Sequence, residues 1–198
     1  FVGEGVLIPR EETALLVDAA VDFCRVTRQP RILDLCSGSG AIAVACAKAI
    51  PDASVTACEL SPQALEYLQR NVERSRTAVQ IRRCDVLAQP RSGDFLPQDV
   101  ILSNPPYIET AELPGLQREV RHEPQMALDG GADGLDFYRA VTQKWKSALR
   151  LGGSLIFEVG IGQAPSVEDI LARNGFEGIQ TTADTQGIWR VVEGTVNR

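Results

Sequence analysis

The chain has 198 residues, of which 44% are hydrophobic and 23% are charged, so it can bury a core and is neither disordered nor membrane-like. Its formal net charge of −6 argues against a broad nucleic-acid interface, which needs a basic face. No apolar run approaches the ~20 residues that a membrane-spanning helix needs. We therefore expect one cytoplasmic domain with no membrane partner.

The sequence contains five cysteines and one histidine. The cysteines have no C-x-x-C spacing and several stand inside apolar patterns, so we expect buried, reduced thiols instead of disulfides or zinc ligands. His122 cannot build a metal site alone and is interpreted as a structural or loop residue. No metal cofactor is expected.

Helical and strand-like patterns alternate along the chain. Helices are predicted at residues 13–23, 41–50, 62–75, 134–149 and 163–174. Strands are predicted at residues 31–36, 54–59, 79–84, 98–103, 154–159, 176–182 and 187–192. This alternation predicts an α/β fold with a mostly parallel, seven-stranded sheet covered by helices on both faces. The last two strands have too short a connection for a crossover helix, so they should form an antiparallel hairpin at one edge.

A long segment at residues 104–133 has little regular pattern, apart from a short helix expected near residues 111–120. Connections of ~30 residues are unusual and are more often functional than not.

This segment opens with Asn104, Pro105, Pro106 and Tyr107, directly after a predicted strand. Two consecutive prolines fix φ and remove two N–H donors, so the chain must leave the strand in a rigid, extended turn. The turn offers an amide, carbonyls without hydrogen-bond duty and an aromatic face. Such a group can accept both hydrogens of a planar NH2 group, which suits transfer to an amide or an exocyclic amine. The same residues are also common in turns that have no chemical role.

Polar residues also follow the first three predicted strands, and all these strand ends should meet at one edge of the sheet. The first strand leads into a turn with two glycines, where the backbone can approach a ligand before a helix N-terminus. Glu59 ends the second strand, and its carboxylate can accept hydrogen bonds from both hydroxyls of a ribose. Asp85 follows the third strand and could read an adenine edge. Residues 38–43 also match the loose G-x-G-x-x-A pattern of dinucleotide sites, so an oxidoreductase stays open at this point.

Together these motifs resemble those of class I S-adenosylmethionine-dependent methyltransferases, which have a Rossmann-like fold. The turn at residues 34–40 resembles their first motif, Glu59 their ribose-binding acid, and Asp85 with Val86 their adenine-side position. Residues 104–107 are similar to the motif of amine and amide N-methyltransferases.

Two further blocks, residues 7–13 (LIPREET) and 123–139 (EPQMALDGGADGLDFYR), resemble the HemK/PrmC family of release factor N5-glutamine methyltransferases. Residues 158–163 and 184–192 also fit that family's pattern. The resemblance implies S-adenosylmethionine as cofactor, bound by Asp34, Cys36, Ser37, Gly38, Ser39, Gly40, Glu59, Leu60, Asp85, Val86 and Asn104. It implies that the catalytic residues are Asn104, Pro105, Pro106 and Tyr107, which would bind the substrate together with Glu123.

The chain departs from the family pattern at two positions. Cys36 stands where the family usually has glycine, and Glu59 where it often has aspartate. Family members also carry an N-terminal helical domain that helps to hold the release factor. The chain begins at Phe1 without an initiator Met, so we expect a fragment: the methyltransferase domain alone, residues 1–198, with a helical lead-in at residues 1–28.

The resemblance implies methyl transfer to the side-chain amide nitrogen of a glutamine in a peptide chain release factor. We separately expect a monomer, and the acidic charge predicts no direct nucleic-acid contact. One alternative is a nucleic-acid methyltransferase acting on adenine N6 or cytosine N4, which would flip its target base. The acidic charge weighs against it. A cofactor-binding scaffold without turnover is a second alternative, and a dinucleotide oxidoreductase is a distant third.

Overall fold

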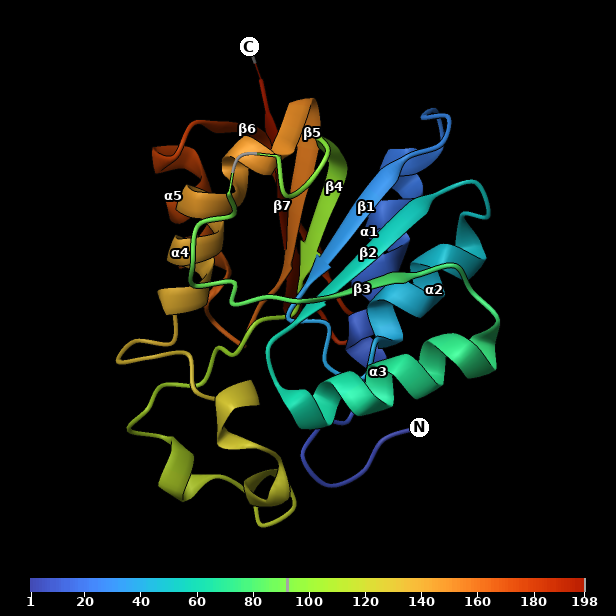
Figure 1. Ribbon diagram of the computed structural model, residues 1–198. Coiled ribbons are helices and arrows are strands. Elements are labelled where there is room, and N and C mark those ends of the chain that lie inside the picture. The colour runs from blue at the N-terminus through green and yellow to red at the C-terminus, as the bar shows by residue number, and fades with distance from the viewer. Residues whose placement is uncertain (92, 198) are drawn as a thin grey trace.

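The computed structural model describes residues 1–91 and 93–197, so Ser92 and Arg198, the last residue of the predicted domain, lie outside the described residues. Its core is a seven-stranded sheet with the order β3-β2-β1-β4-β5-β7-β6 (Figure 1). The parallel strands are β1 (Arg31–Leu35), β2 (Ser54–Glu59), β3 (Gln80–Arg83), β4 (Gln98–Ser103) and β5 (Leu149–Glu158). The antiparallel strands are β6 (Phe176–Ala183) and β7 (Trp189–Val196). The predicted sheet and its edge hairpin are confirmed.

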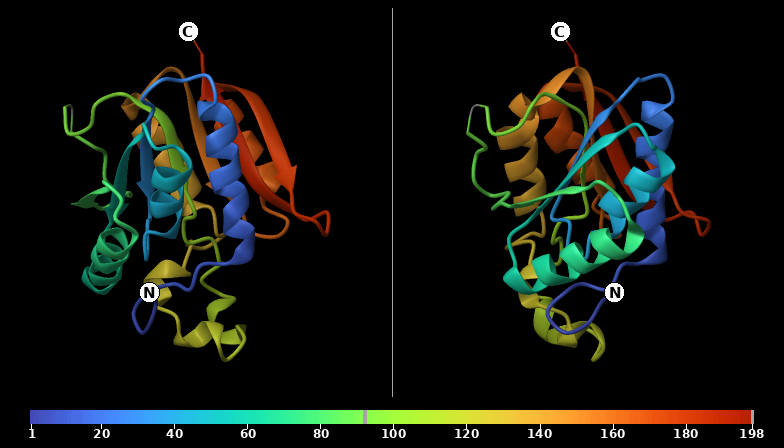
Figure 2. Two further views of the ribbon diagram at one scale, coloured as in Figure 1. Left: turned by 90° about the vertical axis from the view of Figure 1, so that its right-hand side faces the viewer. Right: turned by 45° about the vertical axis from the view of Figure 1, so that its right-hand side comes forward.

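Helices cover both faces of this sheet (Figures 1 and 2). One face carries α1 (Ala14–Cys24), α2 (Ala41–Ala49) and α3 (Pro62–Ser75). The other face carries α4 (Asp136–Trp145) and α5 (Ala164–Arg173). Within the described residues, no helix combines the length and apolar character that a membrane crossing requires.

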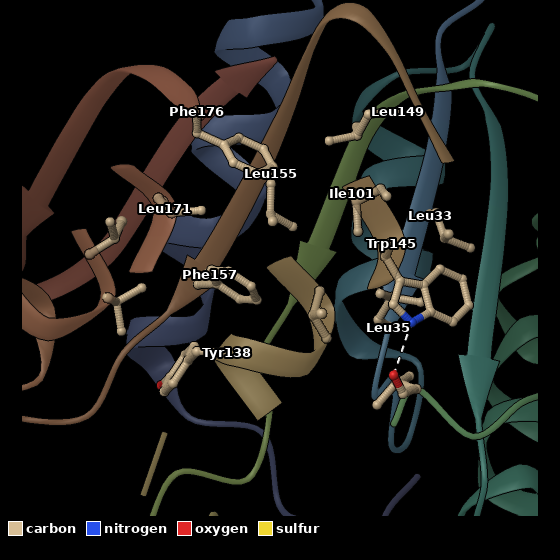
Figure 3. Packing of buried hydrophobic residues seen from close by; sticks show 14 of the residues in the cluster. Leu33, Leu35, Ile101, Tyr138, Trp145, Leu149, Leu155, Phe157, Leu171 and Phe176 are labelled. Carbon is tan, nitrogen blue, oxygen red and sulfur yellow. Dashed lines mark hydrogen bonds between the residues drawn. The ribbon is translucent and has the colours of Figure 1, made fainter. Parts of the chain in front are cut away.

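Each central strand contributes side chains to two separate cores, because successive residues of a strand point to opposite faces. In β1, Ile32 belongs to the core that includes residues of α1 and α2, whereas Leu33 belongs to the core that includes residues of α4 and α5. The α4 side is built around aromatic side chains (Figure 3). Tyr138 and Phe157 meet edge to face with ring centroids 5.2 Å apart, and Trp145 Nε1 donates a hydrogen bond of 2.9 Å to the carbonyl of Val86. This bond ties α4 to the segment that follows β3.

Two local predictions need correction. The helix expected near residues 111–120 is wrong: short 3-10 turns stand there instead, η2 (Leu113–Gly115), η3 (Val120–His122) and η4 (Gln125–Ala127). Pro114 and Gly115 prevent a continuous α-helix through this segment. The fifth strand, predicted at residues 154–159, begins at Leu149 in the structure; it includes Gly152, which has φ +75°, and its pairing with β4 shifts register there. The glycines form a bulge, so the strand starts earlier than expected.

Two irregular segments gather at the carboxyl ends of the parallel strands, namely the N-terminal residues 1–13 and the loop at residues 104–133 (Figures 1 and 2). Within the loop, Ile108 and Asp129 form a parallel bridge, and the Ile108 amide donates to Leu128 O at 2.9 Å. An ion pair of 2.6 Å between Arg10 and Glu123 joins the two segments. They therefore enclose the sheet edge at which the sequence predicts ligand binding.

We expect Trp145→Phe to lower the free energy of unfolding by about 1–3 kcal/mol, because the buried Val86 carbonyl loses its donor. Chemical denaturation measures this change. Trp189→Phe is the matched control, since Trp189 is 51% exposed and its replacement should alter stability by no more than about 0.5 kcal/mol. Equal stability of the two variants would contradict a structural role for the Trp145 bond.

Candidate active site

A cavity of about 470 Å³ lies at the carboxyl ends of β1 to β4. This volume is in the usual range for a small-molecule site. Residues that follow each of the four strands line it, namely Cys36, Gly38, Glu59, Leu60, Cys84, Asp85, Val86, Asn104 and Pro106. The structure therefore brings together residues from all four strand ends that the sequence singled out.

The two glycines of the turn after β1 serve different purposes. Gly38 has φ +54°, and nothing lies within 4 Å of the position where a Cβ would stand, so its bare backbone borders the cavity. Gly40 has φ +81°, and a Cβ there would lie 2.2 Å from Cδ1 of Leu68. Gly40 therefore permits α3 to pack beneath the start of α2, whereas Gly38 leaves room for a ligand.

Glu59 connects the turn after β1 to the start of α3. Its Oε2 accepts a hydrogen bond of 2.7 Å from the Gly38 amide, and its Oε1 accepts bonds of 2.8 Å from the amides of Leu60 and Ser61. A carboxylate oxygen can accept more than one hydrogen bond, so the group retains acceptor capacity toward the cavity that it lines. The backbone amides fix its position before any ligand binds.

Cys36 introduces strain and bulk at the cavity. Its φ of +61° lies in the left-handed region, which a residue with a Cβ rarely adopts. Glycine would meet this conformation without strain, which explains why the departure from the family pattern matters physically. Burial raises the pKa of the Cys36 thiol, so the side chain stays protonated and is a weak nucleophile at neutral pH.

The other predicted cofactor residues of this turn shape it from beneath. The Asp34 side chain is fully buried, and its Oδ2 accepts a bond of 3.2 Å from the Ala43 amide. Ser37 Oγ donates 2.8 Å to the Asp34 carbonyl, and the Ser39 carbonyl accepts 2.8 Å from Asn71 Nδ2. None of these three side chains, nor Gly40, is among those that line the cavity within the described residues.

Just after β3, Asp85 and Val86 border the cavity next to the end of β2, where the Cys84 amide donates a hydrogen bond of 3.0 Å to the Glu59 carbonyl. Asp85 Oδ1 accepts a hydrogen bond of 2.9 Å from the Leu87 amide, which closes a tight turn. The Val86 carbonyl is occupied by Trp145, so the position of this turn depends on α4.

The turn after β4 separates the large cavity from a smaller one of about 230 Å³. Asn104 borders both cavities, Pro106 borders the large one, and Pro105 and Tyr107 border the small one. The wall of the small cavity also includes Leu7, Arg10, Ile108, Leu116, Val120, Ala127 and Leu128. The Asn104 side chain is thus placed where groups in the two cavities would meet.

Glycines hold the Tyr107 end of this turn in place. A Cβ on Gly130 would lie 2.7 Å from Tyr107 Cα and 2.9 Å from the Pro106 carbonyl oxygen. A Cβ on Gly134 would lie 2.4 Å from the Tyr107 carbonyl oxygen, which accepts a bond of 2.9 Å from Gln163 Nε2. These contacts leave the turn little freedom to shift.

Glu123, predicted to bind substrate, borders neither cavity among the described residues. Its side chain is 6% exposed and pairs with Arg10, which borders the small cavity. Its second oxygen, Oε2, is buried and has no hydrogen-bond partner in the described part of the chain. Glu123 therefore reaches the small cavity through Arg10.

Several cavity residues lie outside the strand-end motifs. Val6, Leu7, Met126 and Phe137 line the large cavity from segments far from the strand ends. Their contribution depends on how the irregular segments fold over the sheet, and no local periodicity signals it. The resemblance of residues 7–13 and 123–139 to one family was the signal that these segments matter.

Burial raises the pKa of Asp34 from 3.8 to about 7, so folding favours its protonated form. The buried charge therefore destabilises the protein increasingly between about pH 4 and pH 7, and fully above that range. We expect Asp34→Asn to raise the melting temperature by several degrees at pH 8 but not at pH 4. Thermal unfolding at both values measures this, with Asp52→Asn at an exposed position as the control. A pH-independent difference would contradict the raised pKa.

Comparison with known proteins identifies the family to which this chain is similar. Residues 12–131 match the family model "Methyltransferase small domain". The release factor glutamine methyltransferase of Gloeobacter violaceus is 46% identical over 96% of this chain and 67% of the relative. That of Geobacter sulfurreducens is 44% identical over 98% of this chain and 67% of the relative. The chain thus spans about two thirds of the length of these relatives.

A solved structure of a glutamine methyltransferase is also similar to this chain. The release-factor-specific protein-(glutamine-N5) methyltransferase of Alicyclobacillus acidocaldarius is 32% identical, with a TM-score of 0.60. The match covers 100% of this chain and 99% of that one. By fold and sequence, the chain belongs to the release factor glutamine methyltransferase family.

Proposed function

We propose that this chain transfers a methyl group to the side-chain amide nitrogen, N5, of a glutamine in a peptide chain release factor. The observation that carries the proposal is the position of Asn104, which borders both cavities, next to Pro105, which borders the small one. A donor in the large cavity and an amide in the small one would meet at this turn. Similarity to relatives named for this reaction supports the choice of substrate.

The cofactor of the family is S-adenosylmethionine, and the large cavity fits it. The bare backbone at Gly38 leaves space, and the fixed Glu59 carboxylate suits the two hydroxyls of a ribose. Leu60 and Val86 add apolar surface beside Asp85, as an adenine ring requires. When bound, S-adenosylmethionine supplies a methyl group attached to a positively charged sulfur.

An amide nitrogen is a poor nucleophile because its lone pair is delocalised into the carbonyl. We assign Asn104 Oδ1 and the Pro105 carbonyl as acceptors for its two N–H groups. Within residues 1–91 and 93–197, no donor hydrogen-bonds to the Pro105 carbonyl, so it is free to accept. Two fixed acceptors orient the NH2 group and favour positive charge on nitrogen as the bond forms.

The rest of the turn keeps these acceptors in place. Pro106 limits the backbone, and the Tyr107 ring would pack against the plane of the substrate amide. Glu123 would act by holding Arg10 at the small cavity. The proton of the methylated amide can leave after the transfer, so the chemistry requires no strong general base.

The partner in this proposal is the protein substrate, bound by a monomeric enzyme in the cytoplasm without direct contact to nucleic acid. The net charge of −6 supports the last point, because the phosphate backbone attracts basic surfaces.

Asn104→Ala should lower the rate of methyl transfer by about 10²-fold or more, by analogy with the loss of an oxyanion-hole donor, while cofactor affinity stays unchanged. The assay uses labelled S-adenosylmethionine with a release factor, the same factor lacking its candidate glutamine, and duplex DNA. Asn197→Ala, at an exposed site remote from the cavities, is the control. If Asn104→Ala transfers methyl groups as fast as the parent, Asn104 is not an acceptor in the reaction. If the label appears on DNA, the substrate is a nucleic acid and not a release factor.

Gly130→Ala should also slow transfer, because the new Cβ meets backbone atoms of Tyr107 and Pro106 that cannot move independently. A displacement of ~1 Å at the turn costs up to ~10²-fold in rate. Gly115→Ala is the matched control, since Gly115 lies in the same loop and, its chain neighbours aside, no atom of the described residues lies within 4 Å of the added Cβ. Rates and melting temperatures are compared for both variants. Equal rates would show that the turn tolerates the displacement.

A further inference from the structure

Glu158 is a buried carboxylate directly behind the catalytic turn. It is the last residue of β5, and β5 pairs with β4 so that Phe157 lies opposite Ser103. The next residues of the two strands are Glu158 and Asn104, which places them side by side. Glu158 is 4% exposed, and its Oε2 has no hydrogen-bond partner within the described residues. The reaction described above gives this group no role.

The contacts of Glu158 lead to the Asn104 amide. Asn104 Nδ2 lies 3.5 Å from the Thr13 hydroxyl oxygen, which is a long hydrogen bond. Burial raises the pKa of Glu158, and hydrogen bonding by the Thr13 and Asn104 side chains opposes that rise. With Asn104 beside Glu158 in the strand register, both side chains face the carboxylate. The Thr13 hydroxyl can accept from Asn104 and donate to Glu158 at the same time.

We propose that Glu158 is a positioning residue that fixes the orientation of the Asn104 side-chain amide. Its ionised carboxylate accepts hydrogen bonds from Asn104 Nδ2 and from the Thr13 hydroxyl, so the NH2 end of the amide faces β5. The Oδ1 end must then face the cavities. The consequence for catalysis rests on the proposed function, whereas the orientation itself does not.

The orientation matters because the two ends of an amide have opposite hydrogen-bonding properties. With Oδ1 toward the substrate, Asn104 accepts a hydrogen from the NH2 group; with Nδ2 there, it would oppose that group with two donors. The two arrangements have nearly the same shape, so packing alone does not choose between them. A carboxylate behind the amide selects one orientation, because it only accepts hydrogen bonds and can pair only with the NH2 end.

Charged groups on the surrounding elements shift the pKa of Glu158 in both directions. Burial raises its pKa, the nearby Glu12 raises it further, and Arg190 of β7 lowers it. Arg190 is held by Asp184 at 2.9 Å and by Glu12 at 3.6 Å. The phenols of Tyr107 and Tyr138 also face the carboxylate, and Tyr138 Oη bonds to the Glu158 backbone carbonyl. Protonation of Glu158 would turn one acceptor oxygen into a donor and release the constraint on Asn104.

Kinetics of the full chain with a release factor test the consequence. Glu158→Gln should lower kcat about 10-fold while KM and cofactor affinity stay unchanged, because a neutral amide is a weaker acceptor. In the parent, kcat should fall as pH falls through the pKa of Glu158, and this acid limb should be absent in Glu158→Gln. Glu193→Gln is the matched control, since burial also raises the pKa of this carboxylate on β7. An unchanged kcat and acid limb in Glu158→Gln would overturn the proposal.

Nuclear magnetic resonance tests the orientation without any substrate. The Asn104 side-chain amide signals are identified by their absence in Asn104→Ala. We expect them to shift with pH in the parent, to shift less in Thr13→Val, and to stay constant in Glu158→Gln. Signals that ignore pH in the parent, or that titrate equally in Glu158→Gln, would overturn the proposal.

These two readouts separate failure of the inference from failure of the proposed function. If the parent methylates no release factor, the proposed function fails, and the Asn104 signals alone decide the role of Glu158. If Glu158→Gln does not fold, its melting temperature shows it. Thr13→Val then carries the kinetic test, with a reduced kcat expected and an unchanged kcat overturning the proposal.

Discussion

The site depends on the abrupt end of β4 at Pro105 and Pro106. Ser103 is still fully buried and paired in the sheet, and its hydroxyl donates 2.9 Å to the Leu35 carbonyl of β1. The next residues cannot continue the ladder, because two prolines provide no N–H donors. The chain therefore leaves the sheet at its centre, with carbonyls that the sheet does not occupy. The long loop returns over this turn, and Gly130 makes that close return possible.

Glu59, Asp34 and Glu158 are buried carboxylates near the turn, and the structure satisfies the hydrogen-bonding capacity of each differently. Glu59 is held by three backbone amides, which fix the position of its carboxylate. Asp34 receives one amide bond, and burial raises its pKa strongly. Glu158 lies between these cases, with polar side chains and an arginine opposing the effect of burial. The number of hydrogen bonds that each carboxylate accepts therefore matches its role. Glu59 anchors a loop, Asp34 packs beneath a turn, and Glu158 orients the neighbouring amide.

The sequence predicts the sheet well, because strand periodicity and strand-helix alternation are local signals. It also predicts that Glu59, Asp85 and Asn104 meet, since the carboxyl ends of parallel strands share one edge. It does not separate Gly38, which borders the cavity, from Asp34, which lies beneath it, because both belong to one turn. The sequence likewise does not predict the pairing of Arg10 with Glu123, since these residues are 113 positions apart and lie in irregular segments.

Acceptors for a planar NH2 group do not by themselves distinguish a glutamine amide from an exocyclic amine of a base. The walls of the small cavity make that distinction. They are mostly apolar, with Leu7, Leu116 and Val120 around one arginine, Arg10. The charge of Arg10 is already paired with Glu123, so it is poorly suited to receive a phosphate. An apolar slot that ends at two carbonyl acceptors matches a side chain with a methylene stem and an amide tip. The same turn can therefore serve different substrates in different proteins, and in the proposed function the irregular segments around it select the amide.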